Sequence, residues 1–224
     1  MLIPRLDILP PAQRSLWPRL VELPHSFVLY GGTAVALRIG HRQSVDFDFF
    51  SDVGLDDPGK RSLLALPWLA EGRVMQNEAD TLTVSADIGN APVKLSFFGG
   101  LSVGCVAPPD RTDDGVLLVA SERDLLAHKL KVIHNRAEAK DYVDIAALVA
   151  HGMRLDQGLA DMVSLFGGQV PPAVTLKTLT WFEDIDEAAR LTAPMRRTII
   201  QAVGDLPGIL PASTVYALEL TPGK

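Results

Sequence analysis

A glycine pair followed by an alternating acidic strand constrains this chain most. HSFVLYGG, residues 25–32, is typical of a short apolar strand that ends in two glycines. The small-residue run after it has helical character and closes at Gly40, and SVDFDFFSD, residues 44–52, alternates polar and aromatic side chains as a strand does. Strand, tight turn, helix and strand therefore succeed one another, which predicts an α/β fold.

The alternation places two carboxylates on one side of the second strand. Successive side chains of a strand point to opposite faces, so Asp46 and Asp48 project together while Phe47 and Phe49 enter the core. Two adjacent like charges are unfavourable unless a cation neutralises them, and hard oxygen ligands suit Mg²⁺. The spacing alone is also compatible with a solvated strand face.

The glycine turn strengthens the metal interpretation. Gly31 and Gly32 stand where a strand ends and a helix begins, so absent side chains and free backbone N–H groups let a triphosphate approach closely. Thr33 adds a hydroxyl donor. Together with the acidic pair, this turn indicates metal-assisted phosphoryl chemistry.

Three extended segments follow, GRVMQNEA, TLTVSADIG and APVKLSFFGG, with turn residues between them, and they predict a meander. Ser121 and Asp124 then form a capping-box pattern that predicts a helix start, and the rest of the chain has mainly helical patterns. The sequence therefore predicts a mixed sheet with flanking helices, followed by a helical region.

A second charged motif lies between Lys129 and Asp144. If the first helix continued to Arg136, Lys129 and Arg136 would share a face, and Asp141 and Asp144 share a face of the next helix. The same motif is equally typical of a solvated helical hairpin whose helices are joined by salt bridges. Each such surface salt bridge contributes little to stability.

The two motifs together resemble a known family. Gly31-Gly32-Thr33 followed by Asp46-Phe47-Asp48 resembles the nucleotidyltransferase superfamily. More narrowly, GGTAVALRIGHRQSVDFDFF resembles the first motif of the AbiEii-type nucleotidyltransferase toxins, and Lys129-Leu130, a later Arg136 and Lys140-Asp141-Tyr142-Val143-Asp144 resemble their second. The resemblance implies a nucleotidyltransferase core over residues 1–120 and a helical region over residues 121–224 that closes the active-site cleft.

The resemblance also implies roles for individual residues. It assigns catalysis to Asp46, Asp48, Lys129 and Asp141, with Mg²⁺ held by Asp46 and Asp48. It assigns nucleotide binding to Gly31, Gly32, Thr33, Arg42, Ser44, Lys94, Arg136 and Lys140. Two positions stay open: Arg42 either contacts phosphate or holds its turn by backbone hydrogen bonds, and Asp144 is catalytic or structural.

One position departs from the family pattern. Classical members carry a third carboxylate on a later strand, and the aligned position here is Ser96, with Asp87 on the preceding strand as a substitute or as an ordinary surface residue. This departure leaves a binding module without catalysis as an alternative function. A small-molecule, antibiotic-modifying nucleotidyltransferase is another, although such enzymes lack the Lys-Asp-x-x-Asp helix.

The implied reaction transfers a nucleotidyl group from an NTP to an acceptor hydroxyl, with tRNA as the first candidate acceptor and a protein as the second. The resemblance also implies a cognate antitoxin.

The composition limits the other functions of the chain. A net charge of −6 argues against a protein that coats nucleic acid non-specifically, so any phosphate site is local. With Cys105 as the single cysteine and no long apolar run, we expect a cytoplasmic protein without membrane contact.

Overall fold

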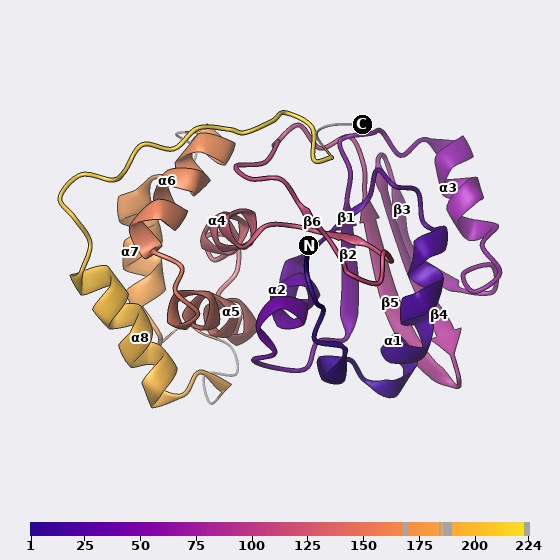
Figure 1. Ribbon diagram of the computed structural model, residues 1–224, viewed down its shortest axis with the longest axis horizontal. Coiled ribbons are helices and arrows are strands. Elements are labelled where there is room, and N and C mark those ends of the chain that lie inside the picture. The colour runs from indigo at the N-terminus through magenta and orange to yellow at the C-terminus, as the bar shows by residue number, and fades with distance from the viewer. Residues whose placement is uncertain (168–169, 184, 186–189, 222–224) are drawn as a thin grey trace. The chain divides into compact units, whose positions relative to one another are not determined.

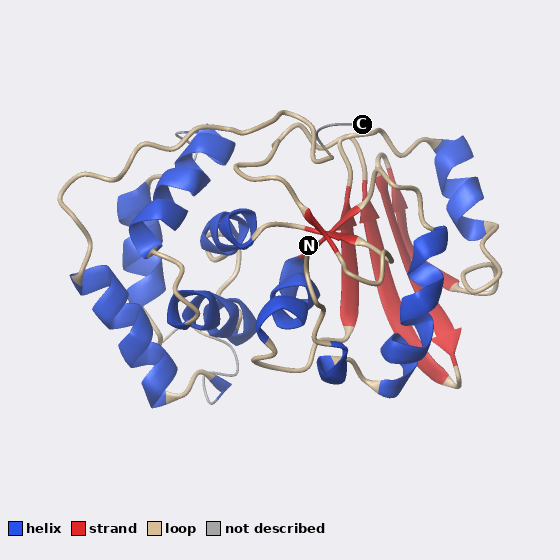
Figure 2. Ribbon diagram, viewed as in Figure 1, coloured by secondary structure: helices blue, strands red, loops and turns tan. Residues whose placement is uncertain are grey.

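The computed structural model describes residues 1–167, 170–183, 185 and 190–221, and the chain divides into two compact units (Figure 1). The first unit comprises Met1–Gly104, Pro108–Ala120 and Leu218–Lys224, and the second comprises Cys105–Ala107 and Ser121–Ala217. The named strands all belong to the first unit, and the second is built from helices (Figure 2).

Within the described residues, seven strands form one mixed sheet in the order β3-β4-β5-β2-β1-β7-β6. The strands are β1 Val28–Tyr30, β2 Asp46–Phe50, β3 Arg73–Glu78, β4 Thr81–Ile88, β5 Ala91–Phe98, β6 Asp110–Arg111 and β7 Leu118–Val119. β2 runs antiparallel to β1 and parallel to β5, whereas β3, β4 and β5 form an antiparallel meander. The predicted mixed sheet with a meander is confirmed.

Aromatic residues of β2 and β5 form part of the core on one face of this sheet. Phe47 and Phe49 of β2 are fully buried, and the ring of Phe49 stacks on that of Phe97 in β5, with centroids 5.3 Å apart. Helices of the first unit are η1 Leu6–Ile8, α1 Pro11–Leu16, η2 Trp17–Glu22, α2 Gly31–Ile39 and α3 Asp57–Leu64. α1 contacts β4 and β5, and α2 contacts β1 and β2, so these two helices lie on neighbouring parts of the sheet.

The second unit contains α4 Glu122–Val132, α5 Ala139–Ala150, α6 Leu155–Phe166, α7 Pro172–Thr180 and α8 Ala193–Gly204. The predicted helix start is confirmed, because the amide of Asp124 donates to the Ser121 hydroxyl at 3.1 Å. α4 and α6 pack closely where α6 carries Gly158, since a Cβ atom there would lie 2.5 Å from a methyl carbon of Leu126.

The C-terminal segment forms no named strand in its described part. An isolated bridge pairs Cys105 with Ala217, and the amide of Leu220 donates to the Asp52 carboxylate at 3.1 Å. In the part of the chain that is described, no helix combines the length and the apolar character that crossing a membrane requires.

Candidate active site

The acidic pair lies on the polar face of β2. Asp46 and Asp48 are half-buried, whereas the phenylalanines between and after them are buried on the opposite face. The strand register sets their neighbours: Asp48 pairs with Tyr30 of β1 on one side and with Ser96 of β5 on the other, and Asp46 pairs with Lys94. Both carboxylates therefore share one side of the sheet, as the alternation predicts.

The glycine turn lies directly against this pair. Gly31 begins α2 with a φ angle of +72°, a conformation that L side chains rarely adopt. A Cβ atom at Gly31 would lie 2.5 Å from Oδ2 of Asp48, so only glycine fits beside this carboxylate. The N-terminus of α2, where a helix leaves N–H groups without intrahelical partners and has its positive dipole end, thus lies next to the acidic pair, an arrangement that suits an anionic ligand.

Thr33 and Ser44 are buried and bonded to each other. The Thr33 hydroxyl donates to Ser44 Oγ at 2.8 Å and also contacts the backbone carbonyl of Asp46. These bonds join α2 to the residue that starts β2, so both side chains hold β2 against the helix. Their predicted contact with nucleotide stays a prediction, because their hydroxyls already have partners.

Arg42 and Lys94 differ in their surroundings. Nη1 of Arg42 donates to the carbonyl of Gln43 at 2.9 Å, in keeping with a residue that holds its turn. Lys94 is exposed on the polar face of β5, beside Asp46 in the register. Of the two predicted phosphate contacts, Lys94 is therefore the cation that the sheet places next to the acidic pair.

The third-carboxylate position is occupied by a hydroxyl. Ser96 is buried and lies directly opposite Asp48 on the parallel strand. Asp87 is exposed on the same face but pairs with Pro92, one strand further away and two residues beyond the Lys94 row. In the described part of the chain, no group of three or more His, Cys, Asp or Glu side chains has the geometry to hold a metal ion.

Lys129 is the centre of a buried ion cluster in the second unit. Its ammonium lies 2.7 Å from a carboxylate oxygen of Asp141 and 2.6 Å from one of Asp144, and both aspartates are fully buried. Burial lowers the pKa of Lys129, but the Asp144 and Asp141 carboxylates outweigh it and the pKa lies above its ordinary value. Lys129 is therefore a charged residue that ties α4 to α5.

Arg136 and Lys140 complete this cluster at the surface. Nε of Arg136 lies 3.1 Å from Asp141, and its Nη1 lies 3.2 Å from Glu138, which also accepts from Lys140 at 2.8 Å. Three cations thus face three carboxylates. Because α4 ends at Val132, the condition under which Lys129 and Arg136 would share one helix face is not met. Arg136 reaches Asp141 from the connection between the helices.

Sequence reasoning did not identify Glu138 or the pairing of Asp144 with Lys129. The signal for Asp144 was present, because Asp141 and Asp144 share a face of α5 and a buried pair of acids requires a cation. Glu138 carried no signal in the sequence, since it precedes the helix and is only half-buried.

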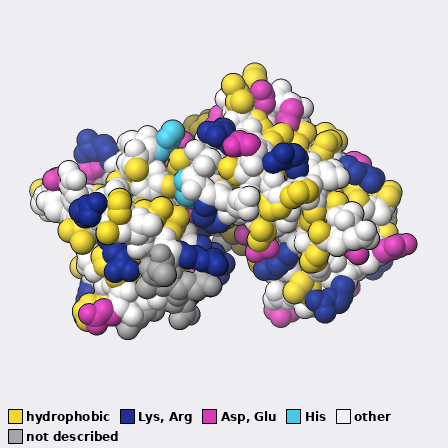
Figure 3. Space-filling view, turned by 90° about the horizontal axis from the view of Figure 1, so that it is seen from below, with side chains coloured by type: hydrophobic (Ala, Val, Ile, Leu, Met, Phe, Trp, Pro, Cys, Tyr) yellow, Lys and Arg dark blue, Asp and Glu magenta, His cyan; other side chains and the backbone are white. Residues whose placement is uncertain are grey.

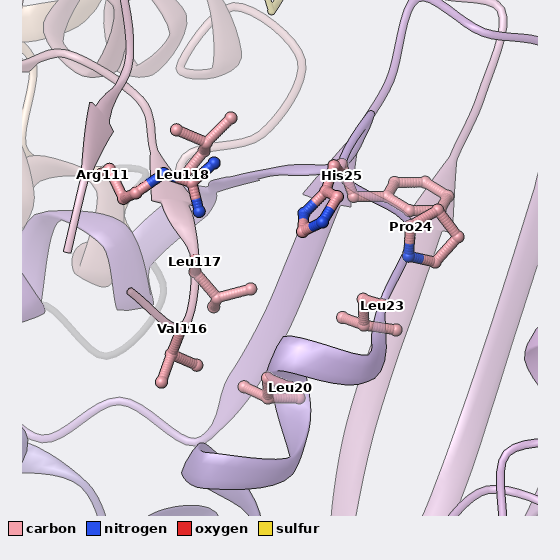
Figure 4. A pocket seen from close by; sticks show the side chains of 9 residues that line it. Leu20, Leu23, Pro24, His25, Arg111, Val116, Leu117 and Leu118 are labelled. Carbon is pink, nitrogen blue, oxygen red and sulfur yellow. The ribbon is translucent and has the colours of Figure 1, made fainter. Parts of the chain in front are cut away.

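A surface pocket of the first unit lies apart from these residues. Leu20, Leu23 and His25 line it from one side, and Arg111 and Leu118 from the other (Figure 4). None of the predicted site residues is among its described lining residues, and the lining is mainly apolar. The candidate site is therefore the acidic pair with its neighbours and not this pocket.

Comparisons with known proteins identify the family and a similar fold. The family model "Nucleotidyl transferase AbiEii toxin, Type IV TA system" matches residues 16–214. The uncharacterized protein aq_aa25 of Aquifex aeolicus is 29% identical over 178 residues, which cover 78% of this chain and 84% of that protein. The fold resembles that of the nucleotidyltransferase toxin MenT4 from Mycobacterium tuberculosis, with a TM-score of 0.62 and 18% identity over 91% of this chain and 84% of that one.

Proposed function

Because this chain belongs to the AbiEii nucleotidyltransferase toxin family and is thus a nucleotidyltransferase, we propose that it transfers a nucleotidyl group from an NTP to an acceptor hydroxyl with Mg²⁺. The observation that carries this proposal is the convergence of Asp46, Asp48 and Gly31 at the start of α2. Two carboxylates supply hard oxygen ligands, and the adjacent helix start favours phosphate.

The donor set fits a divalent cation. Asp46 and Asp48 are half-buried acids on one side of a strand, and the missing side chain of Gly31 lets Oδ2 of Asp48 lie against the start of α2. Bound there, Mg²⁺ would neutralise the carboxylates and offset the charge on the phosphates. The Thr33 and Ser44 hydroxyls hold β2 to α2, so that both carboxylates keep their direction toward the helix start.

We propose that the Lys94 ammonium offsets the negative charge of the leaving phosphates. It is exposed, stands beside Asp46 in the register, and has no ion-pair partner among the described residues. Lys129 and Asp141 stay predicted as catalytic residues on the family resemblance, and their ion pair supports a structural duty in the second unit.

We propose tRNA as the acceptor and a protein hydroxyl as the second candidate. The test incubates purified protein with Mg²⁺, each of four α-labelled NTPs, and either total RNA or cell extract, beside Asp46→Asn and Asp48→Asn. Asp87→Asn is the matched control, because it removes a carboxylate from the same face away from the pair. We expect label on tRNA-sized RNA to fall roughly 100-fold or more in the first two variants only.

Ser96 favours one other function, a module that binds nucleotide without turnover. That function would be established instead if no NTP gave a labelled product while the protein still bound NTP with Mg²⁺, and if Asp48→Asn abolished this binding.

The proposed antitoxin has a separate test. Expression of the chain should slow cell growth, Asp48→Asn should not, and co-expression of the neighbouring gene should restore growth.

A further inference from the structure

One register row leads away from the acidic pair across four strands. Asp46 of β2 pairs with Lys94 of β5, Lys94 pairs with Ser85 of β4, and Ser85 pairs with Arg73 of β3. Paired residues of neighbouring strands point to the same face. The side chains from Asp46 to Arg73 therefore lie in line on the polar face, and we call them the basic row.

A bulge at Met75 preserves this arrangement on the edge strand. Arg73 pairs with Ser85 before the bulge and Gln76 pairs with Thr83 after it, so two residues three positions apart both point to the polar face. Without the extra residue, either Arg73 or Gln76 would turn to the opposite face, because the side-chain period of a strand is two.

The two cations of the basic row are available to a ligand. Lys94 and Arg73 are exposed, and within the described residues neither forms a salt bridge or a side-chain hydrogen bond. Asp87 lies on the same face, two residues beyond Ser85, and no ion pair joins it to either cation. By contrast, Lys129, Arg136 and Lys140 are held by carboxylates.

The basic row is not part of a generally basic surface. On the face of the molecule in Figure 3, Lys and Arg side chains are dispersed among acidic and hydrophobic ones, and the whole chain has a net charge of −6. The two exposed cations in line with Asp46 therefore arise from the strand register and not from a general excess of positive charge.

The length of the row distinguishes between ligands. Neighbouring strands lie about 4.8 Å apart, so Lys94 is about 5 Å and Arg73 about 14 Å from β2 across the sheet. The phosphates of an NTP at Asp46 and Asp48 lie within reach of Lys94. Arg73 lies two strands and about 10 Å beyond Lys94, so an anion that contacts both cations must extend across the sheet, as a nucleic-acid strand does with one charge at each nucleotide.

We propose that the basic row holds the backbone of a nucleic-acid acceptor, with Arg73 as a residue that contacts acceptor phosphate and not the NTP. This inference rests on the proposed nucleotidyl transfer and deepens it, because it assigns the path of the polynucleotide acceptor to named residues. Lys94 stands where the path meets the NTP, so it contributes to both ligands.

The test compares Arg73→Gln with Arg61→Gln in the full chain. Arg61 is an exposed arginine of α3 in the same unit, without a described ion pair and outside the basic row. Binding of a fluorescent single-stranded RNA of about 12 nucleotides is measured by anisotropy over a series of NaCl concentrations. Transfer rates are then measured with the RNA and the NTP varied in turn.

We expect Arg73→Gln to weaken RNA binding roughly threefold to tenfold, to reduce the slope of log Kd against log salt by about one, and to raise the acceptor KM with the NTP KM unchanged. Arg61→Gln should match the wild type. The proposal for the basic row would be overturned if both variants bound RNA equally well. It would also be overturned if Arg73→Gln changed the NTP KM instead of the acceptor KM, or if it reduced only the labelling of protein.

The two proposals fail separately. If the wild type transfers no nucleotide but Arg73→Gln still weakens RNA binding with the lower salt slope, the transfer function fails and the basic row stands as an RNA surface. If transfer to RNA depends on Asp48 but is indifferent to Arg73, the function stands and the basic row is wrong.

Discussion

Gly31 and Asp48 approach so closely that a Cβ atom on Gly31 would lie 2.5 Å from Oδ2 of Asp48. Gly31 also has a φ angle of +72°, and Gly115 has a similar φ angle of +75° but open space around it. Comparing these two glycines therefore distinguishes two effects of an added side chain: backbone strain and collision with the Asp48 carboxylate.

We expect Gly31→Ala and Gly115→Ala both to lower the free energy of unfolding by about 1 kcal/mol or somewhat more, because each places alanine at a positive φ angle. Only Gly31→Ala should also reduce nucleotidyl transfer, by roughly tenfold or more, since it displaces the Asp48 carboxylate. Urea unfolding and initial transfer rates measure the two effects. Full activity in Gly31→Ala would show that Asp48 tolerates displacement.

Lys129→Met should destabilise the protein strongly. The substitution leaves Asp141 and Asp144 buried without their central cation, and breaking a buried ion pair in this way costs roughly 3–5 kcal/mol. Lys140→Met is the matched control, because its ion pair with Glu138 is exposed and contributes less than about 1 kcal/mol. Urea unfolding compares them, and a similar loss in both variants would contradict a structural role for the cluster.

His128 should make stability depend on pH. Burial, with a smaller effect from Lys131, lowers the pKa of His128 to about 3, so the folded protein keeps it neutral while the unfolded chain takes up a proton below pH 6.5. Its contribution is complete above pH 6.5 and is lost as pH falls toward 3, by about 1.4 kcal/mol for each pH unit.

In His128→Leu this part of the pH dependence should disappear. Urea unfolding of wild type and variant is measured at several pH values between about 7.5 and 5, on either side of the ordinary pKa of 6.5. It gives the slope of the free energy of unfolding against pH for each protein. Parallel slopes would show that His128 titrates alike in the folded and unfolded chains.

Ser96→Asp should turn the acidic pair into a cluster that requires metal. The new carboxylate would lie buried beside Asp48, so repulsion should lower the Tm without Mg²⁺, and added Mg²⁺ should raise it more than in the wild type. Ser85→Asp is the control, because it lies on the same face beside Lys94. Thermal unfolding with and without Mg²⁺ measures the change in Tm for each variant. An equal rise in Tm with Mg²⁺ in both variants would argue against a cation at Asp48.

Local patterns of the sequence determined the elements that carry the acidic pair. The alternation in residues 44–52 placed Asp46 and Asp48 on one face of β2, and the glycine pair placed the start of α2 beside them, because both features depend on the geometry of adjacent residues. The cap at Ser121 was predictable for the same reason.

Contacts between distant segments were decided only by the tertiary structure. The end of α4 at Val132 determines that Arg136 approaches Asp141 from a loop, and the packing of α4 on α5 determines that Lys129 has two carboxylate partners. The alignment of Arg73 with Asp46 needs the registers of three strand pairings and one bulge. The pairing of β2 with β5 joins strands that are far apart in the chain, so no local pattern in the sequence contains its register.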